Sequence, residues 1–169
     1  EEALIVLQRA LLISLLEAQS TMAAMVPMVD DSRLAELADL AVALQPDKTF
    51  VSIFPTLMPA ICLQQAKNLV RTAPTDDVFS ALDAFADALD GACDAMSNPV
   101  NPGIFDKVED MLWDDADDEV ARTRSEGVAE LRAAYVSALE SDVLWDSLRD
   151  DGRFRQAIAR ISDSPEARR

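Results

Sequence analysis

Residues 3–26 are almost continuously apolar, and their aliphatic side chains recur at intervals of three and four residues. This spacing follows the 3.6-residue repeat of an α-helix and predicts one apolar stripe along it. The stripe consists of Leu4, Leu7, Leu11, Leu15, Ala18, Met22 and Met25. Because other aliphatic residues cover the remaining sides, we expect a long helix at the centre of a bundle, or one that a partner covers.

Two charged residues, Arg9 and Glu17, interrupt this apolar segment. A membrane span needs about 18 or more consecutive apolar residues, so we expect none in this chain. The segment also lacks the basic start and small-residue cleavage pattern of a signal peptide, and we expect a cytoplasmic protein. The helical pattern begins abruptly at Glu1, so the alternative that residues upstream of it have been removed stays open.

The rest of the chain repeats the helical pattern in shorter pieces, separated by breaks rich in proline, glycine and aspartate. With four glycines in 169 residues, a strand-rich fold with many tight turns is disfavoured. We expect one all-α domain over residues 1–169, a bundle of six to eight helices. Beyond the first helix, the expected helices cover 33–44, 59–72, 76–96, 104–113, 120–140 and 154–161.

The helix expected over 76–96 has the clearest division into faces. Its apolar face consists of Val78, Phe79, Leu82, Phe85, Leu89, Cys93 and Met96. Its acidic stripe includes Asp83, Asp87, Asp90 and Asp94. Residues 76–119 hold fourteen acids and one lysine, whereas the last 21 residues hold six arginines. The acidic stripe therefore predicts a solvated face partly neutralised by the arginine-rich C-terminal helix, a docking face for a basic partner, or a cation-binding face.

The chain contains no histidine, which excludes several classes of site. Ser-His-Asp and Cys-His nucleophile pairs, HExxH zinc sites and phosphorelay histidines all require one. The four glycines stand apart, so no glycine-rich phosphate loop is present. With 31 acids against 15 bases the formal charge is −16, and direct nucleic-acid binding is disfavoured. We expect no cofactor.

One acidic run has a spacing that suits a metal. Asp114, Asp115 and Asp118 satisfy the DDxxD pattern and resemble the Mg²⁺-diphosphate motif of isoprenoid synthases. Paired carboxylates are hard ligands that suit Mg²⁺ with a phosphate co-ligand. Those enzymes carry a second metal motif, and we find no second motif in this sequence.

Four of the six methionines lie in the first third of the chain, near an uncharged segment. Methionine adapts to varied apolar partners, so these side chains suit a groove for an amphipathic helix or an apolar small molecule. The same residues also fill ordinary cores, which is the commoner explanation. The groove candidates are Met22, Met25, Met28, Phe50, Phe54 and Met58.

Together these patterns favour a non-enzymatic helical interaction protein, an adaptor or an assembly or export chaperone. Its expected partner is another protein that is basic or presents an amphipathic helix, and we expect the chain itself to form a homodimer. Two alternatives stay open. One is a dimeric helical domain that senses an apolar ligand, and the other is a Mg²⁺-dependent enzyme acting through the 114–118 motif.

Overall fold

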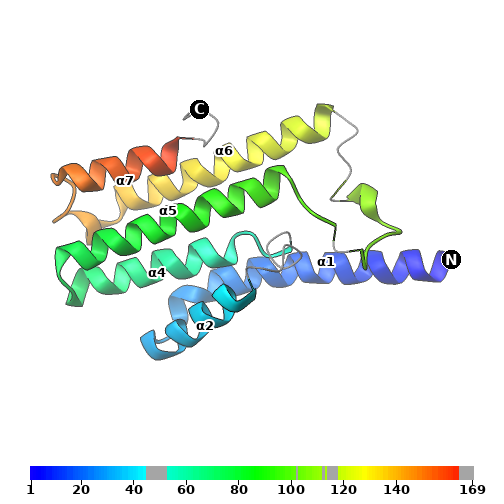
Figure 1. Ribbon diagram of the computed structural model, residues 1–169, viewed down its shortest axis with the longest axis horizontal. Coiled ribbons are helices and arrows are strands. Elements are labelled where there is room, and N and C mark those ends of the chain that lie inside the picture. Colours follow the sequence, from blue (N-terminus) through cyan, green and yellow to red (C-terminus); the bar gives the residue numbers. More distant parts are fainter. Residues whose placement is uncertain (45–52, 102, 112, 114–117, 164–169) are drawn as a thin grey trace.

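The computed structural model describes residues 1–44, 53–101, 103–111, 113 and 118–163. Within these ranges the chain has six α-helices and no strand, which confirms the all-α prediction (Figure 1). The helices are α1 (Glu2–Met25), α2 (Asp31–Leu44), α4 (Leu57–Thr72), α5 (Thr75–Ser97), α6 (Asp118–Ser141) and α7 (Gly152–Ser162). Their bounds lie within a few residues of those predicted from periodicity.

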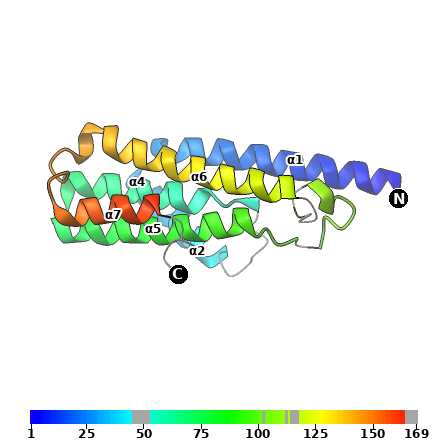
Figure 2. The same ribbon diagram turned by 90° about the horizontal axis from the view of Figure 1, so that it is seen from above.

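The main core lies among α4, α5, α6 and α7, which run side by side (Figures 1 and 2). The predicted apolar face of α5 is buried in it from Val78 to Cys93, with Met96 half-buried. Phe85 packs edge-on against Tyr135, with ring centroids 5.0 Å apart. Trp145 stacks on Phe154 at 5.9 Å and joins the end of α6 to α7. Aromatic side chains thus close the core at the points where the helices meet.

Side-chain caps fix the starts of some helices. Asp142 accepts a hydrogen bond from the Leu144 backbone N–H, and Asp151 accepts one from the Arg153 N–H, so both carboxylates cap the helices that follow. Helix α5 has no such cap, because its N-cap residue is Pro74 and no side chain accepts a hydrogen bond from its first backbone N–H groups.

Pro59 lies inside the first turn of α4, two residues after the helix begins. The first backbone N–H groups of a helix have no partner within it, so a proline there removes no hydrogen bond. The helix therefore begins at Leu57, two residues before the predicted start at residue 59.

The α-helix predicted over 104–113 is not formed. The described part of this segment consists of turns and a short 3₁₀-helix, Glu109–Met111. The Lys107 backbone N–H donates to the Gln8 side chain, 2.9 Å away, instead of to a carbonyl one helical turn earlier. Phe105, Val108 and Trp113 are all buried toward α1. A tertiary contact thus takes the place of a local hydrogen bond at Lys107, whereas Val108, Met111 and Trp113 still donate to nearby carbonyls.

Helix α1 does not lie at the centre of the bundle, which was the first of the two positions expected for it; the second, a helix that a partner covers, stays a prediction. It runs along one edge of the molecule, and its amino-terminal end reaches past the ends of α5 and α6 (Figures 1 and 2). Gln8 and Leu12 are its two buried residues. The main core is buried without α1, because the apolar inner faces of α4 to α7 cover one another.

Candidate functional site

The inner side of α1 is held by one polar contact and one apolar contact. Gln8 donates from Nε2 to the Asp106 carboxylate at 2.8 Å and accepts from the Lys107 backbone N–H. Leu12 is 0% exposed and belongs to a small cluster with Phe105, Val108 and Trp113. The hydrogen bond from Gln8, together with the Lys107 ammonium, lowers the pKa of Asp106. The polar groups and the apolar cluster that hold α1 in place therefore both lie far from it in the sequence.

The outer side of α1 carries the apolar stripe predicted from the sequence. We call Leu4, Leu7, Leu11, Leu15, Ala18, Met22 and Met25 the α1 stripe. Leu7 is 64% exposed and Met25 is 55% exposed. The other members are also exposed, except for the half-buried Leu15. The stripe thus lies beside the buried side of the helix, with Leu15 at its inner border and its other members exposed, and it forms our candidate functional surface.

Charged side chains of α1 lie away from the stripe. At about 100° of rotation per residue, Glu2, Arg9 and Glu17 each lie more than roughly 100° around the helix from the centre of the stripe. Met28, which follows the helix, is 83% exposed and extends the apolar surface. Exposed apolar patches bordered by polar residues are typical of binding surfaces in soluble proteins.

The predicted methionine groove is divided by the structure. Met22, Met25 and Met28 lie on the outer surface. Phe54 and Met58 are half-buried and pack against the cluster around Leu57 and Ile61, between α2 and α4. Phe50 lies outside the described residues. The first three residues therefore join the α1 surface, whereas Phe54 and Met58 contribute to packing.

The acidic stripe of α5 has partners inside the molecule. Arg160 of α7 forms ion pairs with Asp83, Asp87 and Asp90. Asp90 also pairs with Arg132 of α6, with 2.7 Å between the guanidinium and the carboxylate. At the other end of α7, Arg153 lies 2.6 Å from Asp76 and over the ring of Phe79. Asp94 accepts from Asn98 at 3.1 Å. These carboxylates help to hold α6 and α7 against α5.

The predicted magnesium motif falls mostly outside the described part of the chain. Asp114 and Asp115 lie in the undescribed range 114–117, and Asp118 is the exposed first residue of α6. Across the ranges that the structure describes, no group of three His, Cys, Asp or Glu residues is placed to hold a metal ion. The metal prediction therefore gains no support from the described residues.

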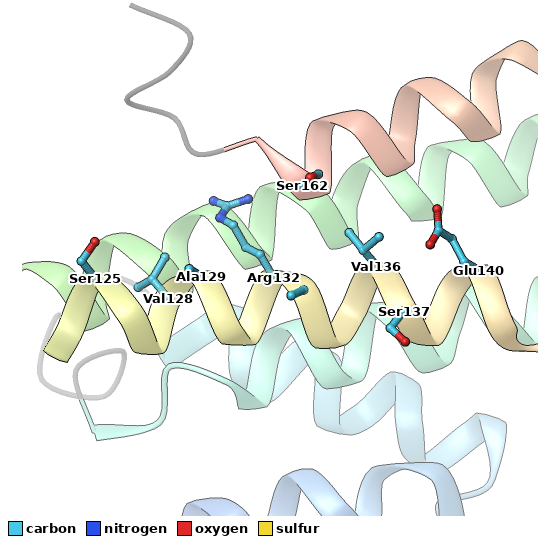
Figure 3. A pocket seen from close by; sticks show the side chains of 9 residues that line it. Ser125, Val128, Ala129, Arg132, Val136, Ser137, Glu140 and Ser162 are labelled. Atoms are coloured by element: carbon cyan, nitrogen blue, oxygen red, sulfur yellow. The ribbon is translucent and has the colours of Figure 1, made fainter. Parts of the chain in front are cut away.

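A shallow hollow of about 420 Å³ lies between α6 and the end of α7 (Figure 3). Its walls are mostly small or aliphatic, including Val128 and Val136, with the Ser162 hydroxyl at its rim. Arg132 lines it, but its side chain is 4% exposed and donates to Asp90 and to the Ile161 carbonyl. Arg132 is thus engaged within the fold, and the other charged residue that lines the hollow is the exposed Glu140.

Residues Glu2–Met28 are long and apolar enough to cross a membrane, by length and composition alone. Arg9 and Glu17 led us to expect no membrane span, but the mean hydropathy of the segment stays high enough for one despite these two charges. Core helices and signal sequences pass the same criterion, but a core helix is mostly buried and only 11% of this window is. The low burial of this window distinguishes α1 from a typical core helix.

No family model matches this chain, and neither the curated proteins nor the solved structures contain a match to it. A functional conclusion therefore depends on the surface of α1 and its chemistry.

Proposed function

We propose that the chain is a non-enzymatic protein-interaction module in which a second helix binds along the α1 stripe. One observation carries the proposal: a regular apolar stripe stays exposed on a helix that contacts the bundle through another side. Such a module serves as an adaptor or as an assembly or export chaperone. The proposal needs no cofactor.

The spacing of the stripe favours a helix as the bound element. Its members follow one another at intervals of three and four residues over three heptads, from Leu4 to Met25. A helix with this spacing offers holes into which side chains of a second helix fit as knobs. Met22 and Met25 have flexible, polarizable side chains that adapt to the facing surface. An amphipathic helix therefore fits the stripe better than an extended peptide does.

Lipid is a less suitable occupant than protein. The Gln8 side chain holds α1 to Asp106 and to the Lys107 backbone, so a spanning α1 would carry these polar groups into hydrocarbon or lose both hydrogen bonds. The formal charge of −16 also repels the anionic lipids of a cytoplasmic leaflet. A protein helix covers the stripe without breaking the Gln8 hydrogen bonds and without bringing the chain against anionic lipid.

Photo-crosslinking in the cells that express the protein tests the proposal. A photoreactive residue is placed at Leu7, at Met25, or at the exposed Glu130 on α6 as the control. We expect protein adducts from the two α1 positions, mapped to a helical peptide, and a background level from Glu130. Leu11→Glu in the same chain should remove the adducts, because it places a charge in the seam. Adducts to lipid alone, or equal protein adducts from all three positions, would refute the proposal.

A further inference from the structure

We infer that the helix bound on the α1 stripe is α1 of a second copy of this chain, in antiparallel orientation. This inference rests on the proposed function and names the partner for the same surface. It predicts a two-fold homodimer in which one patch contacts itself.

The stripe is self-complementary when two copies run in opposite directions. If residue numbers that face each other add up to 29, Leu4 faces Met25, Leu7 faces Met22, and Leu11 faces Ala18. Because the axis is two-fold, each contact occurs twice. A branched leucine then meets either a flexible methionine, which adapts to its shape, or a small alanine. The six side chains in these pairs are all exposed in the single chain.

Charge selects the antiparallel orientation. The acids of α1 are Glu2 and Glu17, and Glu1 precedes the helix. Glu2 and Glu17 lie outside the seam, but in a parallel pair the two Glu1-Glu2 ends would lie side by side at one end of it, which is unfavourable between like charges. In the antiparallel pair Glu1 and Glu2 lie beside Met28 and Pro27, and the two amino termini are separated by roughly 36 Å, the length of a 24-residue helix.

The surroundings of α1 leave room for such a pair but limit its strength. The amino-terminal end of α1 extends past α5 and α6 in both views, so a second helix can lie beside it (Figures 1 and 2). The exposed surface of the stripe corresponds to about two and a half fully exposed residues, summed over Leu4, Leu7, Leu11, Met22 and Met25. This area is small compared with a stable interface, so we expect a dissociation constant on the order of 10 μM.

Sedimentation equilibrium of the full chain tests the dimer directly. The mass should rise from 18.4 kDa toward twice that value as the concentration increases from about 1 to about 200 μM. Added salt should strengthen association, because two copies of charge −16 repel each other and an uncharged seam loses nothing by screening. Leu11→Glu should remain monomeric. Val143→Glu, on an exposed turn after α6, should dimerise like the unaltered chain.

Engineered cysteines test the orientation. Leu4→Cys combined with Met25→Cys in one chain should form disulfide-linked dimers on oxidation, because these positions face each other across an antiparallel seam. Leu4→Cys alone should not, since its two copies lie at opposite ends of the seam. Efficient dimers from Leu4→Cys alone would overturn the antiparallel arrangement. The native cysteines, Cys62 and Cys93, are buried and provide the background.

The two proposals fail in distinguishable ways. A mass of 18.4 kDa at about 200 μM and high salt overturns the homodimer. If Leu7 then crosslinks to a helix of a different protein, the interaction module stands and only the identity of its partner is wrong. If Leu7 crosslinks to lipid alone, both proposals are wrong.

Discussion

Truncating α1 on its two sides should have very different effects on stability. Leu12→Ala removes three carbons from a side chain that is fully buried among Phe105, Val108 and Trp113. Leu7→Ala removes the same three carbons from the exposed stripe of the same helix. The two variants have the same chemistry and nearly the same helix propensity, so they differ mainly in burial.

The exposed fractions determine the expected magnitudes. At about 0.8 kcal/mol per buried methylene, Leu12→Ala loses about 2.4 kcal/mol of transfer free energy, and the cavity brings the total to about 3–4 kcal/mol. Phe105 and Trp113 stack on each other at 5.4 Å, and these rigid rings limit how far the cavity collapses. Leu7 is only about one-third buried, so Leu7→Ala should lose about 0.5–1 kcal/mol.

Urea unfolding followed by circular dichroism provides the free energies of unfolding, at about 1 μM chain so that self-association contributes little. Hydrogen exchange of the α1 amides then shows whether the loss is local, as expected for a helix held by a small separate cluster. Leu12→Ala should accelerate exchange throughout α1, and Leu7→Ala should leave it nearly unchanged. Equal losses in the two variants, or a larger loss for Leu7→Ala, would refute the assignment of the buried side.

Three further outcomes follow from the contacts of the bundle. Asp90→Asn should lower the free energy of unfolding by about 2–4 kcal/mol in urea, because it leaves the buried Arg132 guanidinium without its carboxylate; a loss below about 1 kcal/mol would contradict this. The Lys67 ammonium lowers the pKa of Asp142, so this carboxylate stabilises the fold above its unfolded pKa near 4 and loses that effect as the pH falls. Asp142→Asn should therefore reduce the difference between the urea midpoints at pH 7 and pH 3. An unchanged difference would contradict the stabilising role of the Asp142 carboxylate. Burial raises the pKa of Cys62 to about 11, so at pH 8 its thiol should react with Ellman's reagent about 200-fold more slowly than a free thiol, and a rapid reaction in the folded chain would exclude that burial.

Helix positions and the faces of α5 are determined by the sequence itself. Aspartates occupy the outer side of α5 while Phe85 and Leu89 occupy the other, so local periodicity leaves one way to bury the helix. Asp142 and Asp151 similarly cap the helix that follows each of them, because capping involves residues only two positions apart. In such places the physical cause and the sequence pattern lie within one helical turn.

The buried side of α1 is decided only by the tertiary structure. This helix is apolar around most of its circumference, so its periodicity defines a stripe from Leu4 to Met25 without showing which side of the helix packs on the bundle. The structure leaves every member of that stripe except Leu15 exposed. Its true inner face contains a polar residue, Gln8, which sequence reasoning passes over. Gln8 is buried because Asp106 and Lys107, almost 100 residues away, satisfy both ends of its amide. A hydrogen bond between such distant residues leaves no periodic signal, and it is this contact, with Leu12 beside it, that turns the stripe outward.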